Sequence, residues 1–210
     1  MQSRIGSEDS GVLTLFHTAD SNATLFGAIA ESAGVEVRHV VRADLLAAAE
    51  AADGLSPAVR KAAVDSLRTA AGRGPVVCTC STLGPAADDL ADAGLAVRRV
   101  DRLLAERAVA GGGRIAVLYA VATTEGPTRE LFERSARDSG AGAAIEMRLV
   151  SGAWDRFREG DAQGYARLIA DAVSGLDDGY AAVALAQASM APAAALCERP
   201  VLTSPGVLFG

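Results

Sequence analysis

Aromatic residues make up only 4% of this 210-residue chain, although half of its residues are hydrophobic. Its core must therefore be built mainly from Ala, Val and Leu. The sequence also lacks an apolar run of about 18 residues, the length that a membrane-spanning helix requires, so no membrane partner is expected. A net charge of -6 and scattered arginines argue against nucleic acid as a partner, since a phosphate backbone selects clustered positive charge.

Metal and nucleotide motifs are absent as well. The two histidines and three cysteines show no metal-ligand spacing, and neither GxGxxG nor a P-loop is present. We therefore expect no nucleotide cofactor and no metal. Cys78 and Cys80 lie two positions apart in an apolar run, where they would face the same side of a strand and form only a strained disulfide. Free thiols are typical of a reducing compartment, which favours a cytoplasmic location.

Apolar runs alternate with amphipathic stretches along most of the chain. The polar residues 1–10 lack the apolar segment of a secretory signal and are expected to form a disordered tail. Strands are predicted at 12–16, 35–41, 75–79, 97–100, 115–119, 144–149, 182–185 and 200–203. Helices are predicted at 23–33, after 41, from 57, and at 85–93, 101–110, 127–138, 162–174 and 192–197, with none after the last strand. This alternation predicts an α/β fold with a mostly parallel sheet.

The two halves of the sequence resemble each other. The segment that contains Cys80 and Pro85 matches one that contains Gln187 and Pro192. Gln187 lies 107 positions after Cys80, and Pro192 lies 107 positions after Pro85. A glycine triplet at 111–113 separates the halves and is typical of a linker. We therefore predict two pseudo-symmetric, doubly wound lobes, 11–110 and 111–210, that face each other across a cleft at the carboxyl ends of their strands.

Cys80 is the sharpest candidate for chemistry. It follows a strand and precedes a helix, whose N-terminus would favour its thiolate, although a free cysteine is more often a small buried hydrophobe. Cys78 and Cys197 are expected to be structural. Small polar residues in the same class of loop could clamp a carboxylate or simply cap helices: Ser21, Asn22, Ser81, Thr82, Thr123, Thr124 and Ser189. His17 could supply an acid or hydrogen-bond within its lobe, whereas Glu125 is expected to be a solvated turn residue.

Cys80-Ser81-Thr82 is similar to the first cysteine motif of the aspartate/glutamate/hydantoin racemase superfamily. The segments 15–18, 123–128 and 200–205 also fit, and the resemblance extends from Gly11 to the end of the chain. It implies cofactor-independent chemistry at the α-carbon of a small carboxylate. In that family, one cysteine per lobe removes or returns the α-proton.

The sequence departs from this pattern in its second half, where Gln187 stands in place of the second cysteine. A carboxamide cannot serve as an acid or base near neutral pH, so two-base racemisation is in doubt. The leading hypothesis is a racemase-like or decarboxylase-like enzyme with Cys80 as its lone thiol and Gln187 as a positioning group. The alternative is a non-catalytic protein that binds or senses small carboxylates. A homodimer is compatible with the resemblance.

Overall fold

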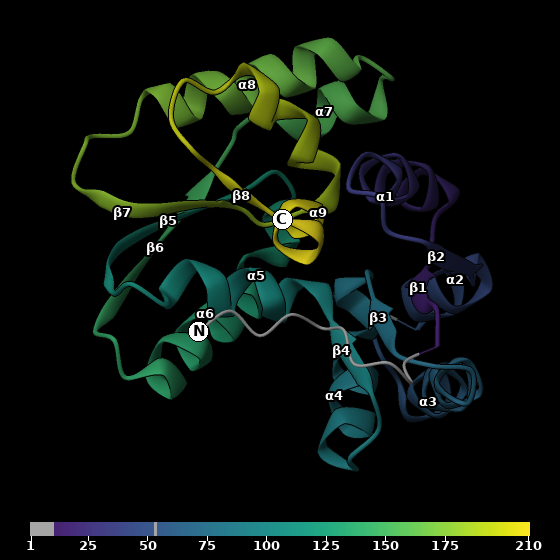
Figure 1. Cartoon of the computed structure of the whole chain (residues 1–210). Coiled ribbons are helices and arrows are strands. Elements are labelled where there is room, and N and C mark those ends of the chain that lie inside the picture. Colours follow the sequence, from purple (N-terminus) through teal and green to yellow (C-terminus); the bar gives the residue numbers. More distant parts are fainter. Residues whose placement is uncertain (1–10, 53) are drawn as a thin grey trace. The chain divides into compact units, whose positions relative to one another are not determined.

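The computed structural model describes residues 11–52 and 54–210, so the predicted tail at 1–10 lies outside the described residues (Figure 1). The chain divides into two compact units, one up to Val100 (unit 1) and one from Asp101 to Gly210 (unit 2). Each unit has its own four-stranded sheet, and the paired strands run parallel throughout. The prediction of an α/β fold with two lobes is confirmed.

Unit 1 has the strand order β2-β1-β3-β4. Its elements are β1 (Leu13–His17), α1 (Asp20–Ser32), β2 (Val37–Val41), α2 (Ala43–Ala51), α3 (Pro57–Ala71), β3 (Val76–Cys78), the 3₁₀ helix η1 (Ser81–Leu83), α4 (Gly84–Asp92) and β4 (Val97–Arg99). Its main core lies on the sheet face covered by α3 and α4, where Phe16 and Cys78 meet Leu67 and Leu90. Few of these side chains are aromatic, as the composition predicts.

Unit 2 repeats this order as β6-β5-β7-β8. Its elements are α5 (Val100–Val109, which starts at the boundary), β5 (Gly113–Tyr119), the 3₁₀ helix η2 (Ala122–Thr124), α6 (Glu125–Ser139), β6 (Ala143–Leu149), α7 (Ala153–Arg158), α8 (Ala162–Ser174), β7 (Tyr180–Leu185), the 3₁₀ helix η3 (Ala188–Leu196), β8 (Leu202–Thr203) and α9 (Ser204–Phe209). The repeated strand order supports the predicted internal duplication.

The sheet of unit 2 is covered on both faces. Figure 1 shows α7 and α8 on one side of it and α5 and α6 on the other. Alternation along β5 explains this layering, since Ala116 and Leu118 pack with α8, whereas Ile115 and Val117 pack with α5 and α6. Because β5 is buried on both faces, its residues 115–119 form a continuous apolar run in the sequence.

The division between the units falls before the glycine triplet that was expected to link the lobes. Helix α5 packs Leu104 and Ala108 against Ile115 of β5, and therefore belongs to unit 2. The triplet forms the turn between α5 and β5. Gly112 and Gly113 have φ angles of 67° and 76°, in the left-handed region that favours glycine.

Two further predictions about secondary structure require correction. A short helix, α9, does follow the last strand, because the Thr203 side chain accepts a hydrogen bond from Gly206 N and Pro205 occupies the first turn. In the segment predicted as a helix at 192–197, residues 192–196 instead belong to the 3₁₀ helix η3, and Cys197 follows it in an extended conformation. In the described part of the chain, no helix is both long and apolar enough to cross a bilayer.

Candidate active site

Cys80 lies where the sequence predicts, between the end of β3 and the first turn of η1. Its carbonyl oxygen accepts a hydrogen bond from Leu83 N at 3.2 Å and one from the Cys78 thiol at 3.5 Å. These contacts fold the chain from an extended strand into the helical turn that leads to α4. The backbone at Cys80 is thereby fixed at the carboxyl edge of the sheet.

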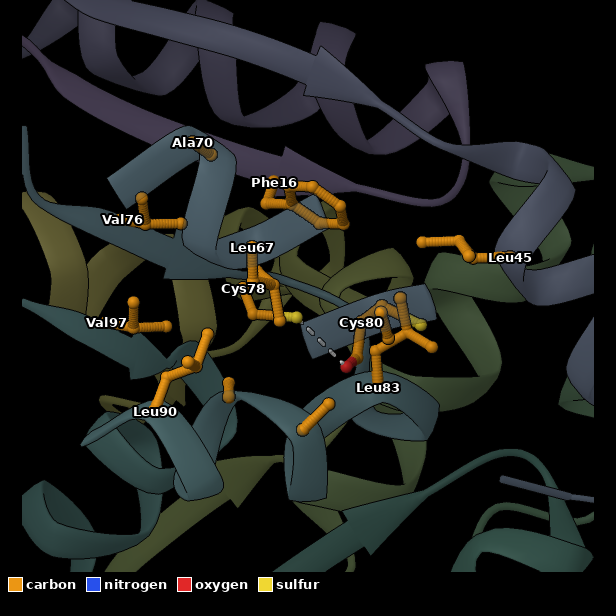
Figure 2. Close-up of a cluster of buried hydrophobic side chains, with 13 residues drawn as sticks. Phe16, Leu45, Leu67, Ala70, Val76, Cys78, Cys80, Leu83, Leu90 and Val97 are labelled. Atoms are coloured by element: carbon orange, nitrogen blue, oxygen red, sulfur yellow. Dashed lines mark hydrogen bonds between the residues drawn. The ribbon is translucent and has the colours of Figure 1, made fainter. Parts of the chain in front are cut away.

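The Cys80 side chain, however, is only 8% exposed. It belongs to the hydrophobic cluster of unit 1, together with Cys78, Leu83 and Leu45, as Figure 2 shows. Cys78 is 1% exposed, in keeping with a packing role. All three cysteines are free thiols, and the third, Cys197, donates a hydrogen bond to Ala193 O. Cys80 is thus at the predicted position in the fold, but its surroundings are largely apolar.

Four of the predicted carboxylate-binding residues lie beside Cys80 at the same edge of the sheet. Ser81 and Thr82 are exposed in η1, and Ser21 and Asn22 occupy the first turn of α1. Among the described residues, none of these four side chains has a hydrogen-bond partner, and the N-cap position of α1 is an alanine. Their polar groups are not used as helix caps and stay available to a ligand.

The helix that follows Cys80 begins at a glycine for a steric reason. A side chain at Gly84 would collide with the guanidinium group of Arg99, which lies over the first turn of α4. Arg99 is itself held by an ion pair with Asp88 at 3.0 Å, and its side chain is only 11% exposed. The loop that carries Cys80 therefore leads into a helix start that is closely packed and charged.

A chain of hydrogen bonds that the sequence did not indicate starts at Thr79, the residue before Cys80, and runs through His17 to His39. Thr79 Oγ1 lies 2.7 Å from His17 Nδ1, and His17 Nε2 lies 2.9 Å from His39 Nδ1. Thr79 Oγ1 also donates to Phe16 O at 3.2 Å. One placement of protons satisfies all three contacts: Nδ1–H of His17 donates to Thr79, and Nδ1–H of His39 donates to Nε2 of His17.

His17 itself is fully buried. Burial, with a smaller contribution from the nearby charge of His39, lowers the pKa of His17 from 6.5 to about 4. The imidazole is therefore neutral near pH 7 and ties the end of β1 to Thr79. In this arrangement it hydrogen-bonds within its own unit, one of the two roles considered for it.

In unit 2, Gln187 follows β7 at the position that Cys80 has after β3. Its Oε1 accepts a hydrogen bond from Ala120 N at 2.8 Å, which links the ends of β7 and β5. Within the described ranges, no protein group pairs with its Nε2. The carboxamide therefore has one structural contact and one donor group left over.

The hydroxyl groups near Gln187 are engaged. Ser189 Oγ lies 2.9 Å from Tyr165 Oη, and Thr124 Oγ1 donates to Val121 O at 2.6 Å. Thr123 lies in η2, but its side chain is outside the described part of the structure. Among the described residues, Ser189 and Thr124 are thus less available to a ligand than Ser81 and Thr82 of unit 1.

The end of β5 carries a second hydrogen-bonded network that the sequence did not indicate. Tyr119 Oη donates to Glu125 Oε2 at 2.5 Å, and Arg129 donates to Glu125 Oε1 at 2.9 Å. Burial, together with the hydrogen bond and charge of Glu125, raises the pKa of Tyr119 to about 12. Glu125 is partly exposed but bound on both oxygens, so the expectation of a merely solvated turn residue is incomplete. Its spacing of four from Arg129 was the available signal.

No group of three or more potential metal ligands occurs in the residues that the structure describes. No family model matches the sequence. No curated protein matches it either.

Solved structures do match. A glutamate racemase from Bacillus anthracis superposes with a TM-score of 0.61 at 14% identity, over 97% of this chain and 80% of that one. The Picrophilus torridus aspartate racemase gives 0.63 at 12% identity, over 93% and 90%. A glutamate racemase from Aquifex pyrophilus gives 0.53 at 13% identity, over 94% and 81%.

The chain has the aspartate/glutamate racemase fold. Similarity at this level of identity establishes architecture, and activity must be argued from the residues. On this racemase fold, the chain carries a thiol, Cys80, after the third strand of unit 1 and an amide, Gln187, after the third strand of unit 2.

Proposed function

We propose that this protein is a cofactor-independent enzyme of the racemase type that acts at the α-carbon of a small carboxylate, with Cys80 as its thiol acid/base. The observation that carries the proposal is the position of Cys80. On a racemase fold, this thiol follows the third strand and precedes a helix, with the unbonded side chains of Ser81 and Thr82 next to it. Ligands of parallel sheets meet this edge.

The chemistry follows from the groups available. The Cys80 thiolate takes the α-proton, and the electron pair moves into the carboxylate to give an enolate-like intermediate. Hydroxyls and backbone N–H groups stabilise the charge that develops on its oxygens. Return of the proton from the same thiol regenerates the original configuration, while exchange of that proton with solvent replaces the α-hydrogen. Gln187, as a carboxamide, can donate and accept hydrogen bonds but moves no proton.

The test measures exchange of the α-hydrogen in deuterated solvent by NMR, using aspartate, glutamate and substituted malonates. We expect wild-type protein to exchange the α-hydrogen of at least one of them, and Cys80→Ser to slow the exchange by about 10²-fold or more. Cys197→Ser is the matched control, since Cys197 lies between η3 and β8 and its thiol donates a hydrogen bond to Ala193 O. Equal exchange by wild type and Cys80→Ser would overturn the proposal.

A second candidate function is non-catalytic binding of a small carboxylate. The burial of Cys80 in an apolar cluster favours it, as does the engagement of Gln187 with Ala120. Calorimetric titration with the same carboxylates separates the two. Binding by both wild type and Cys80→Ser, without exchange by either, supports the binding protein, whereas exchange that depends on Cys80 supports the enzyme.

A further inference from the structure

A cavity of about 360 Å³ opens in unit 1, between the edge strand β2 and helix α3. Phe16, Val40 and Ala70 give it apolar walls, and its volume is in the range of small-molecule sites. It differs from the candidate active site in position. Thr14 pairs with Arg38 near the amino ends of β1 and β2, and Arg73 lies just ahead of β3, whereas Cys80 lies beyond the carboxyl end of β3.

Three arginines line this cavity: Arg38, Arg42 and Arg73. Arg42 is held in place by a two-pronged ion pair with Asp44, at 2.8 and 2.7 Å, and by a hydrogen bond to Ser66 at 2.7 Å. Arg38 and Arg73 have no carboxylate partner in the part of the chain that the structure describes. The protein has a net charge of -6, yet within the described residues the positive charges of these two arginines are not neutralised by a carboxylate.

Hydroxyl groups accompany the arginines. Thr14, Ser66 and Thr69 line the same cavity, and Arg38 reaches Thr14 Oγ1 only at 3.5 Å. The lining holds one carboxylate, Asp65, which is already paired with Lys61 at 2.7 Å. Three guanidinium groups and one carboxylate leave a net charge near +2, and guanidinium groups match phosphate oxygens in geometry.

We propose that this cavity binds a small organic phosphate monoester, with its apolar body against Val40 and Ala70 and its phosphate between Arg38 and Arg73. A monoester carries close to two negative charges near neutral pH and three acceptor oxygens, which match the charge and the donors of the lining. A carboxylate, with one charge and two oxygens, leaves part of both unmatched. This proposal does not depend on the function proposed for Cys80.

The experiment uses the full chain and phenyl phosphate as the probe, with calorimetry and ¹⁵N NMR titration. We expect saturable binding, with amide shift changes at Thr14, Ser66 and Thr69. Arg38→Gln and Arg73→Gln should each weaken binding at least tenfold. Phenol and benzoate should bind more weakly than phenyl phosphate, since the first lacks charge and the second lacks the second charge and third oxygen.

Arg68→Gln is the matched control. Arg68 is exposed on α3, the helix beside the cavity, but it does not line the cavity. The Arg68→Gln variant should bind phenyl phosphate like wild type, and so should Cys80→Ser, which separates this site from the candidate active site. Arg73 is exposed, so its variant remains informative if Arg38→Gln fails to fold. The proposal is overturned if phenyl phosphate does not bind, if it binds equally to Arg38→Gln and Arg73→Gln, or if benzoate binds as tightly.

Discussion

Strands β1 and β5 occupy equivalent positions in the strand orders of their sheets, but they end in different side chains. In unit 1, β1 ends at His17, a buried imidazole that is bonded to Thr79 and His39. In unit 2, β5 ends at Tyr119, a buried phenol that is bonded to Glu125. Tyr119 fixes the segment that follows its own strand through a carboxylate, whereas His17 ties the end of its strand to β2 and to the residue after β3 through its ring nitrogens.

The third strands show the same contrast. The backbones are equivalent, since Thr79 N donates to Phe16 O and Ala186 N donates to Leu118 O, each at 2.9 Å. After these residues, unit 1 has Cys80 and unit 2 has Gln187. The duplicated backbone thus kept its hydrogen bonds, while the side chains at its edges differ in charge, size and proton chemistry.

The largest effect is expected from restoring symmetry at this position. Gln187→Cys places a second thiol on the racemase fold. Since a positioned acid or base contributes about 10²- to 10⁴-fold, inversion of a small carboxylate should rise by about 10²-fold over wild type. The measurement is circular dichroism or chiral chromatography of the substrate after incubation with each protein.

Gln187→Ser is the control for this gain. It also removes the contact from Ala120 N, which should cost about 1 kcal/mol of stability in both variants, but it adds no thiol. Equal inversion rates in Gln187→Cys and Gln187→Ser would mean that this position does not face the reacting carbon, and the correspondence between the two units would not extend to function.

Much of this architecture could be predicted from local sequence. Helix α8 has the predicted bounds because its amphipathic period is strong and Asp161 caps it. The Ser56-Pro57 start of α3 is confirmed for a similar reason, since Ser56 accepts from Val59 N. The position of Cys80 between a strand and a helix also follows from such local signals.

The networks around the candidate site could not be predicted, since they depend on register and packing. His39 reaches His17 only because β1 and β2 pair with Leu15 opposite His39, which places the two imidazoles on one face of the sheet. The burial of Cys80 likewise depends on Leu45, which α2 brings into the cluster from a distant part of the chain. Neither contact leaves a mark in the local sequence.

An intermediate effect on stability is expected from His17. Its pKa is lowered from 6.5 to about 4 in the folded state, so the unfolded chain binds more protons between these values. The free energy of unfolding should therefore fall as the pH drops from 6.5 to 4, by about 1 to 3 kcal/mol for this group. Urea denaturation across this range should show a shallower fall in His17→Asn than in wild type.

Tyr119 should affect the alkaline side of the pH dependence of stability, as His17 affects the acid side. Its pKa is raised from 10 to about 12, so its contribution to stability is complete below pH 10 and is lost as the pH rises towards 12. Tyr119→Phe should alter this alkaline limb and leave the acid limb as in wild type. Identical acid limbs in wild type and His17→Asn would contradict the inferred neutral state of the buried imidazole.

The smallest effects are expected at the N-caps of α3 and α8, the helices that precede the third strand of each unit. Asp161 Oδ1 accepts from Gly164 N at 2.8 Å, whereas Ser56 Oγ accepts from Val59 N at 3.4 Å. The shorter, charge-assisted bond should be the stronger one. We expect Asp161→Ala to cost about 1 kcal/mol and Ser56→Ala about 0.5 kcal/mol in urea denaturation.

The same two variants test whether the units unfold independently. If they do, each variant shifts only the transition of its own unit, and the other transition keeps its midpoint. Asp171→Ala is the matched control on α8, because its side chain is exposed away from the cap and should change stability by less than about 0.5 kcal/mol. A larger loss of unfolding free energy for Ser56→Ala than for Asp161→Ala would contradict this order. It would show that the Ser56 cap contributes more to the stability of α3 than its long hydrogen bond indicates. The duplicated units would then differ in how their helices are held, as well as in the residues that their strands present.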